Sequence, residues 1–267
     1  SPKSDILIGC DLIQDLGLYI KEFPNCTKVA IISDSNVWPL YGDIIENSLS
    51  SAAFEVIHYT FPAGENSKNG DTYLSILNFL AENHLTRSDL LVALGGGVVG
   101  DITGFAAATF LRGVAYIQIP TTLLSMVDSS VGGKTAIDLP AGKNLAGAFH
   151  SPKAVIIDPD CLETLPVEFF SDGLAEAIKY GVIKSEPLFN KLLTEDAHSF
   201  LHELICECVS IKINITENDF FESGDRMLLN FGHTIAHGIE SENNMQNLYH
   251  GECVGLGMLP VCSNDVR

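Results

Sequence analysis

The sequence has few basic residues and no long uncharged hydrophobic run. Its 267 residues include 15 Lys and Arg against 34 Asp and Glu, a formal net charge of −19. Nucleic acids and anionic membranes are bound through basic surfaces, so this balance argues against both partners. The most hydrophobic region, 90–120, is interrupted by Asp101, Arg112 and several glycines, whereas a membrane-spanning helix needs about 20 consecutive apolar residues. We therefore expect a soluble, cytoplasmic protein.

Cysteine pairs with the spacing of a metal-binding motif are also absent. The seven cysteines are an odd number, and no two of them have zinc-knuckle spacing. In a chain of this length, that pattern favours reduced thiols over a disulfide framework. The scarcity of basic residues has a second consequence. An anionic ligand must be bound by one of a few lysines or arginines, so each of these in a glycine-rich or apolar setting is a candidate binding residue.

Short apolar runs alternate with helical segments in the first half of the chain. Buried strands are predicted at 28–33, 54–59, 90–94, 116–119 and 154–157, and an amphipathic helix at 71–83. This alternation predicts a parallel sheet covered by helices. Later segments have helical spacing of apolar residues, namely 172–184, 188–194, 200–214, 226–240 and 253–262. We predict an α/β fold in two domains: residues 1–162 form a Rossmann-like nucleotide-binding domain and residues 163–267 a helical domain.

Glycines and polar side chains follow the predicted strands. The segment 95–101 (GGGVVGD) leaves a strand and opens a helix, where glycines and free amides suit a pyrophosphate. It is not a G-x-G-x-x-G fingerprint, and a tight packing turn explains it equally well. Asp34 and Asn36 end an earlier strand, a usual place for ribose contacts, and the loop 62–68 adds Glu65 and Lys68. Together these strand ends predict a dinucleotide crevice.

A second glycine-rich segment, 128–135, places Lys134 among small residues. Backbone amides and an ammonium group there could hold an oxyanion. The spacing of a Walker A motif is missing, so nucleoside triphosphate hydrolysis is not indicated. Lys143 and Asn144 follow Gly142 in a second polar turn. We expect loops over this region, and surface loops with ordinary lysines remain the alternative.

Three histidines and one glutamate are candidate metal ligands. His233 and His237 are four residues apart and share one face of a helix. His250 opens the last predicted helix, and Glu176 lies among small and apolar residues. A catalytic zinc site uses three protein ligands and one open position. One of the four is therefore surplus, and spacing alone does not say which. Two histidines in one turn are also often a core or surface pair.

At these residues the chain resembles the 3-dehydroquinate synthase family of sugar-phosphate cyclases. The matching stretches are 95–101, 104–108, 112–113, 120–124, 128–135, 142–144, 158–159, 176–181, 226–237 and 250–252. The resemblance implies conversion of 3-deoxy-D-arabino-heptulosonate 7-phosphate to 3-dehydroquinate and phosphate. This lyase reaction of aromatic amino acid biosynthesis uses NAD and one divalent metal, Zn²⁺ or Co²⁺. NAD is reduced and reoxidised in each cycle.

The resemblance also implies roles for individual residues. The metal ligands are Glu176, His233 and His250, and the catalytic residues are His237 for proton transfer, Glu222 and Lys134. The substrate-binding residues are Arg112, Asp128, Lys134, Asn144, Lys179, Lys212, Arg226, Asn230, His237 and His250. The NAD-binding residues are Asp34, Asn36, Glu65, Lys68, Gly96, Gly97, Val98, Asp101, Thr121, Thr122, Lys143, Cys161, Leu162, Glu163 and Thr164. A homodimer is implied, because Arg112 matches an arginine that reaches the phosphate in the neighbouring subunit.

Two departures from the family accompany these matches. Asp172 stands where the family often has Asn near the cofactor. The family also continues beyond Arg267 and has a phosphate-binding lysine there, so we expect the helical domain to be incomplete.

Three other functions remain as alternatives. A sibling sugar-phosphate cyclase would differ at several of the positions Lys134, Asn144, Lys212, Arg226, Asn230 and His237. A metal-dependent polyol dehydrogenase would accumulate NADH. A non-catalytic NAD-binding module would not need the metal and proton-transfer candidates.

Overall fold

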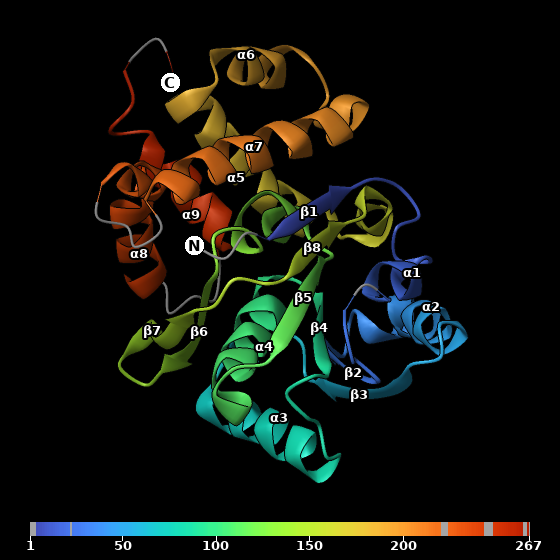
Figure 1. Cartoon of the computed structure of the whole chain (residues 1–267). Coiled ribbons are helices and arrows are strands. Elements are labelled where there is room, and N and C mark those ends of the chain that lie inside the picture. The colour runs from blue at the N-terminus through green and yellow to red at the C-terminus, as the bar shows by residue number, and fades with distance from the viewer. Residues whose placement is uncertain (1–3, 22, 220–223, 243–247, 264–265, 267) are drawn as a thin grey trace. The chain divides into compact units, whose positions relative to one another are not determined.

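The structure, a computed structural model, describes residues 4–21, 23–219, 224–242, 248–263 and 266. The chain forms two compact units, which we call the sheet unit (residues 2–121 and 133–161) and the helical unit (residues 122–132 and 162–267). A parallel sheet with helices in one unit and helices in the other confirm the predicted α/β class (Figure 1). None of the described helices has both the length and the apolar character needed to cross a membrane.

Six parallel strands form the sheet in the order β1-β8-β5-β4-β2-β3. Their bounds are β1 Asp5–Ile8, β2 Lys28–Asp34, β3 Glu55–Phe61, β4 Leu90–Gly95, β5 Ala115–Pro120 and β8 Ala154–Ile157. All five predicted strands are confirmed, within about two residues at each end. Sequence analysis missed β1, a four-residue edge strand without a fully buried residue.

The chain leaves β2 in one direction towards β3 and then returns past β2 to β4 and β5. Because crossovers between parallel strands are right-handed, this reversal places the connecting helices on opposite faces. Figure 1 shows α1 (Leu16–Ile20) and α2 (Trp38–Ser51) on one face, and α3 (Gly70–Glu82) and α4 (Gly97–Thr109) on the other.

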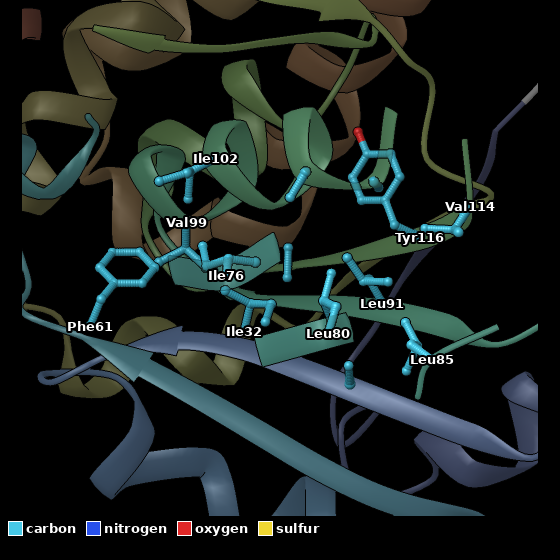
Figure 2. Packing of buried hydrophobic residues seen from close by; sticks show 14 of the residues in the cluster. Ile32, Phe61, Ile76, Leu80, Leu85, Leu91, Val99, Ile102, Val114 and Tyr116 are labelled. Atoms are coloured by element: carbon cyan, nitrogen blue, oxygen red, sulfur yellow. The ribbon is translucent and has the colours of Figure 1, made fainter. Parts of the chain in front are cut away.

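The core of the sheet unit lies between the strands and the pair α3 and α4. Ile32 and Leu91 from the strands pack with Ile76 of α3 and with Val99 and Ile102 of α4, and none of the five is exposed (Figure 2). Full burial of one such side chain contributes roughly 1.5–3 kcal/mol. This core fixes the strand ends at which the predicted NAD residues lie.

The prediction of loops over residues 128–144 is wrong from Lys134 onwards. Strands β6 (Lys134–Leu139) and β7 (Gly142–Phe149) form an antiparallel hairpin, preceded by a helical turn at Ser125–Ser129. The hairpin packs on α4, where a Cβ on Gly104 would lie 2.4 Å from Thr135 Cγ2. Contact with a helix that ends 25 residues earlier stabilises these strands, so local composition alone suggested a loop.

The helical unit contains α5 (Val167–Lys184), α6 (Glu186–Thr194), α7 (Leu201–Asn218), α8 (His233–Glu242) and α9 (His250–Met258). The single helix predicted over 226–240 is wrong, because a 3₁₀ segment (Asp225–Asn230) precedes α8. Gly232 separates them with a φ of 81°, a conformation that glycine adopts without strain. Residues 226–230 and the histidines of α8 therefore lie on separate elements.

Candidate active site

The strand order creates a topological switch point at the carboxyl ends of β2 and β4, where a ligand-binding crevice is expected. The chain leaves these adjacent strands in opposite directions, and open α/β sheets bind ligands at such a switch point. β2 ends at Asp34 and β4 ends at Gly95. The predicted NAD residues Asn36, Gly96 and Gly97 follow directly. The fold therefore brings together strand ends that lie some sixty residues apart in the sequence.

Helix α4 presents the amides of its first turn at this crevice. Its N-cap is Gly96, which has no side chain to cap the helix, and its first turn contains no acidic residue. The first N–H groups of a helix have no partner within the helix and favour an anion. Val98 lies in this turn, half-buried. The arrangement suits a pyrophosphate.

The other predicted NAD residues near these strand ends differ in whether their side chains already have hydrogen-bond partners. Thr121 follows β5, and its Oγ1 is buried without a hydrogen-bond partner in the described part of the chain, so a ligand could satisfy it. Asp34 Oδ1 accepts hydrogen bonds from the backbone N–H of Asn36 and Val37, at 2.8 and 3.0 Å, and so holds the turn before α2. Thr122 belongs to the helical unit, where its Oγ1 accepts from the Ser125 N–H at 3.1 Å.

The predicted NAD segment 161–164 lies in a 3₁₀ turn that spans Pro159–Thr164. Cys161 and Leu162 are buried there, whereas Glu163 and Thr164 are exposed. The Tyr41 hydroxyl donates to the Cys161 carbonyl at 2.9 Å, which ties the turn to α2 within the sheet unit.

Five predicted site residues form a polar network in the sheet unit. Lys68 Nζ donates to Asp101 Oδ2 and to Asn144 Oδ1, both at 2.6 Å. Lys143 pairs with Glu65 at 3.6 Å. Burial opposes the charge on Lys68, but the Asp101 and Glu65 carboxylates outweigh it and raise the pKa of Lys68. Lys68 therefore stays charged and joins α4 to the β7 strand beside the predicted crevice.

In the helical unit, Glu176, His233 and His250 converge. One ligand atom from each lies within 4.8 Å of the other two. Glu176 comes from α5, and the histidines are the first residues of α8 and α9. His237 is outside this group, with a side chain that is 61% exposed and a ring 5.8 Å from that of His233. Of the four candidates that spacing left open, the structure groups three.

Glycines allow the three helices to approach closely enough for this grouping. A Cβ on Gly251 of α9 would lie 2.0 Å from the Asp172 carbonyl of α5. A Cβ on Gly257 would lie 2.2 Å from the Gly232 carbonyl, just before α8. Any larger side chain would separate the helices that carry the ligands. Asp172 also accepts a hydrogen bond from the Gly251 N–H, so this carboxylate caps the start of α9.

The environment of Glu176 fits a bound cation. Its side chain is 1% exposed, and neither carboxylate oxygen accepts a hydrogen bond within the described residues. Lys179 forms an ion pair with Oε2, while Oε1 faces His233 Nε2 at 3.7 Å and His250 Nε2 at 3.9 Å. Lys179 compensates the charge, but Oε1 accepts no hydrogen bond among the described residues, and burial of such an oxygen is costly. Two imidazoles and one carboxylate are the donor set of a catalytic zinc site.

The hydrogen bonds at Nδ1 leave Nε2 of both ligand histidines available. His233 Nδ1 lies 3.2 Å from the Phe231 carbonyl, and His250 Nδ1 lies 2.9 Å from Glu240 Oε1. Both partners are acceptors, so Nδ1 carries the proton and Nε2 keeps its lone pair. Burial and the Lys179 charge lower the pKa of His233. Burial opposes the charge on His250, but Glu240 and Glu176 raise its pKa.

Sequence analysis did not identify Glu240, which is buried on α8. The available signal was its position three residues after His237 on the same helix face. An acidic residue near a histidine is common, however, and only the contact with His250 on α9 distinguishes this one.

Three predicted substrate residues supply buried positive charge. Lys179, Lys212 and Arg226 are 1%, 5% and 2% exposed. Lys212 Nζ lies 2.9 Å from Asp128 Oδ1, and Tyr180 Oη donates to the same oxygen at 2.5 Å. Burial disfavours the Asp128 anion, but Lys212 and Lys179 overcome this and hold the pKa of Asp128 well below its usual range. Sequence analysis missed Tyr180, whose role depends on α5 packing against residues 125–129.

Arg226 is held by a glycine turn. Its Nη2 donates to the Gly132 carbonyl at 3.1 Å, and a Cβ on Gly132 would lie 2.8 Å from Nη2. Gly132 also has a φ of 100°, which other residues rarely adopt. The glycine predicted as part of an anion-binding loop therefore makes room for a guanidinium group.

The remaining predicted site residues are exposed or outside the described residues. Lys134, Asn230 and Arg112 are exposed within their own units. Arg112 follows α4 and has a φ of 67°, which is uncommon for a residue with a side chain. Glu222 lies outside the described residues. Roles in catalysis or binding remain predictions for all four.

Comparisons with known proteins agree with this geometry. Residues 58–172 match the family model for the 3-dehydroquinate synthase N-terminal domain, and residues 173–264 match the model for its C-terminal domain. The chain is 46% identical over 266 residues to the 3-dehydroquinate synthase of Clostridium acetobutylicum, covering 98% of this chain and 75% of that protein.

Two solved structures of other cyclases are also similar. One is 2-epi-5-epi-valiolone synthase from Streptomyces hygroscopicus subsp. jinggangensis with NAD⁺ and Zn²⁺ bound, at a TM-score of 0.87 and 27% identity over 97% of this chain and 73% of that chain. The other is 2-deoxy-scyllo-inosose synthase complexed with carbaglucose-6-phosphate, NAD⁺ and Co²⁺, at a TM-score of 0.87 and 28% identity over 95% of this chain and 70% of that chain.

Proposed function

Because the chain belongs to the 3-dehydroquinate synthase family, we propose that it converts 3-deoxy-D-arabino-heptulosonate 7-phosphate to 3-dehydroquinate and phosphate. The reaction is an NAD- and metal-dependent elimination of phosphate followed by ring closure. The observation that carries the proposal is the convergence of Glu176, His233 and His250 in a unit that also buries Lys179 and Lys212. A sugar phosphate offers hydroxyls for a metal and anionic groups for lysines.

NAD binds at the carboxyl ends of β2 and β4. The amides that open α4 hold its pyrophosphate, and Asp34 and Asn36 contact its ribose. Thr121 Oγ1, buried and without a hydrogen bond among the described residues, gains a partner from the cofactor. NAD supplies a hydride acceptor that is restored within the same cycle, so no NADH accumulates.

Glu176, His233 and His250 hold the divalent metal, Zn²⁺ or Co²⁺. When bound, the metal supplies a Lewis acid that eases loss of a proton from a substrate hydroxyl. Lys179 forms an ion pair with Glu176, so the two buried charges are paired. The proton on Nδ1 of each histidine, set by Phe231 O and Glu240, directs the Nε2 lone pairs to the metal position.

The buried bases bind the anionic groups of the substrate. Lys212 and Arg226 are nearly inaccessible to water, and an ion pair with an anion is stronger in such surroundings than in water. Asp128 keeps Lys212 in place. His237, held at Nδ1 by Glu240 at 3.0 Å, has an Nε2 that can accept a proton, and Glu222 and Lys134 act with it.

The remaining substrate residues bind from other positions. Asn144 and Asn230 contact substrate hydroxyls. Arg112, exposed within its unit, reaches the phosphate of the neighbouring subunit in a homodimer.

Sibling cyclases are the nearest alternative function. The identity of 46% to a 3-dehydroquinate synthase against 27% and 28% to the two other cyclases favours dehydroquinate formation. The residues that would decide between them are Lys134, Asn144, Lys212, Arg226, Asn230 and His237.

The test is to incubate the purified protein with the heptulosonate phosphate, NAD and Zn²⁺ or Co²⁺. We expect equal amounts of phosphate and 3-dehydroquinate, and no net NADH. Absence of phosphate release from metal-loaded protein contradicts the proposal. Net NADH formation with a polyol substrate supports the dehydrogenase alternative instead.

A further inference from the structure

Glu240 contacts two histidines through its two carboxylate oxygens. Oε1 lies 2.9 Å from Nδ1 of His250, and Oε2 lies 3.0 Å from Nδ1 of His237. Glu240 and His237 are one turn apart on α8, whereas His250 opens α9. The Glu240 side chain is 6% exposed, and a charge buried to this extent needs polar partners. A single buried group is therefore in contact with a proposed metal ligand and with the histidine proposed to carry a proton.

The chemistry of a carboxylate determines what both histidines can do. An ionised carboxylate accepts hydrogen bonds and cannot donate them. Both histidines must therefore donate from Nδ1, and each keeps an acceptor lone pair on Nε2. For His250 that nitrogen lies 3.9 Å from Glu176 Oε1, where the metal ligands converge. For His237 it is the atom that can take a proton.

We propose that Glu240 is a shared positioning residue, which fixes the tautomer and orientation of His250 as a metal ligand and of His237 as a proton acceptor. This inference rests on the metal site of the proposed function. It makes metal affinity and proton transfer dependent on one carboxylate. Glu240 does not itself touch the metal or the substrate in this role.

The substitution Glu240→Gln separates this role from a merely structural one. The amide has the shape of the carboxylate but offers one acceptor oxygen and one donor nitrogen. It can accept from only one of the two histidines. The other must turn or adopt the tautomer with its proton on Nε2, which removes its lone pair from the site.

The first measurement is the zinc affinity of the purified wild-type, Glu240→Gln and Glu242→Gln proteins, by competition with a chromophoric chelator. Glu242 is an exposed carboxylate on the same helix, so Glu242→Gln is the matched control. We expect Glu240→Gln to lower zinc affinity roughly 10- to 100-fold, as loss of such partners typically does, and the control to leave it unchanged. Equal zinc affinity in the two variants, together with an unchanged His237 tautomer, overturns the inference.

The second measurement is the histidine tautomer in metal-free protein, from ¹⁵N NMR of the imidazole rings. We expect both His237 and His250 to carry the proton on Nδ1 in the wild type, and one of them to change in Glu240→Gln. Unchanged tautomers in Glu240→Gln contradict the inference even where its thermal stability falls, because stability alone reports only burial of the group.

A double variant tests the sharing itself. When Glu240→Gln is combined with His237→Ala, His237 no longer competes for the amide oxygen, which can then accept from Nδ1 of His250. We expect the loss of zinc affinity caused by Glu240→Gln to be smaller on this background than on the wild type. An equal loss on both backgrounds overturns the sharing. Failure of the wild-type protein to bind zinc contradicts the proposed metal site, which is a different result from equal binding by wild type and Glu240→Gln.

Discussion

The two units prepare their ligand sites by different means. In the sheet unit many of the predicted cofactor residues follow strand ends, and the predicted binding groups include the backbone amides of Gly96 and Gly97. In the helical unit the predicted groups are side chains, most of them charged and buried. Of the four buried bases among the described residues, Lys68 belongs to the sheet unit, and Lys179, Lys212 and Arg226 belong to the helical unit.

This difference follows from what each ligand needs. A backbone amide has no titrating charge, so a nucleotide site built from strand ends costs the fold little. Buried ions lose hydration and must be paired, so the helical unit places Asp128 beside Lys212 and Glu176 beside Lys179. Metal and substrate binding in the helical unit should therefore respond strongly to loss of a charged side chain and to pH. NAD binding in the sheet unit should respond to a charge added at the N-terminus of α4.

The largest effect is expected for Glu176→Gln. The amide is a weaker metal ligand, and its introduction leaves the Lys179 charge buried without its carboxylate. Phosphate release should fall about 10²–10³-fold, while NAD affinity measured by calorimetry stays the same. Glu168→Gln, at an exposed position on the same helix, should keep full activity. Equal activity of the two variants would contradict a metal site at Glu176.

A smaller loss is expected for Gly97→Asp in the sheet unit. A carboxylate in the first turn of α4 should repel the pyrophosphate and weaken NAD binding roughly 10- to 100-fold, without harm to the helix, since acids are favourable there. Gly70 is likewise the first residue of a helix, with nothing within 4 Å of its added Cβ. Gly70→Asp is the control and should bind NAD normally. Zinc affinity should be unchanged in both variants.

Acid should affect zinc binding before NAD binding. The folded protein raises the pKa of His250 above its usual 6.5, so this ring holds its proton to a higher pH than a free histidine. Zinc must displace that proton. As the pH is lowered, zinc affinity should begin to fall while the pH is still above 6.5. It should then decrease by about tenfold for each further pH unit of acidification. Zinc titrations across this range check the expectation, and a constant affinity down to about pH 6 would refute it.

The smallest expected change is in stability. Tyr180→Phe removes the hydrogen bond to the half-buried Asp128 carboxylate and should lower the free energy of unfolding by about 1.5–3 kcal/mol. Tyr73→Phe removes an exposed hydrogen bond to Thr109 in the sheet unit and should cost about 0.5–1.5 kcal/mol. Urea unfolding of metal-free protein measures both. If both variants lose the same free energy of unfolding, a hydrogen bond to a charged group in the helical unit stabilises the protein no more than an exposed neutral one in the sheet unit.

Local pattern was sufficient for five of the six strands of the parallel sheet and for the glycine turn at residues 95–101, because both depend on neighbours in sequence. It was insufficient for the hairpin β6–β7, which is stabilised by α4, and for the break at Gly232, which follows from a backbone conformation. Residues 122–132 follow β5 yet belong to the helical unit, an arrangement that composition does not reveal. Tyr180 and Glu240 were missed because the contacts that distinguish them, with Asp128 and His250, involve other elements.

By itself, the sequence determined the α/β class, the strand ends that suit a nucleotide and a set of four candidate metal ligands. Periodicity and residue chemistry are local properties, and they are sufficient to predict these three features. The family resemblance named Glu176, His233 and His250 as the ligands, but only the tertiary structure brought them within 4.8 Å and placed one buried carboxylate between His237 and His250. Distances between α5, α8 and α9 are set by packing at Gly251 and Gly257, and no single segment contains that information.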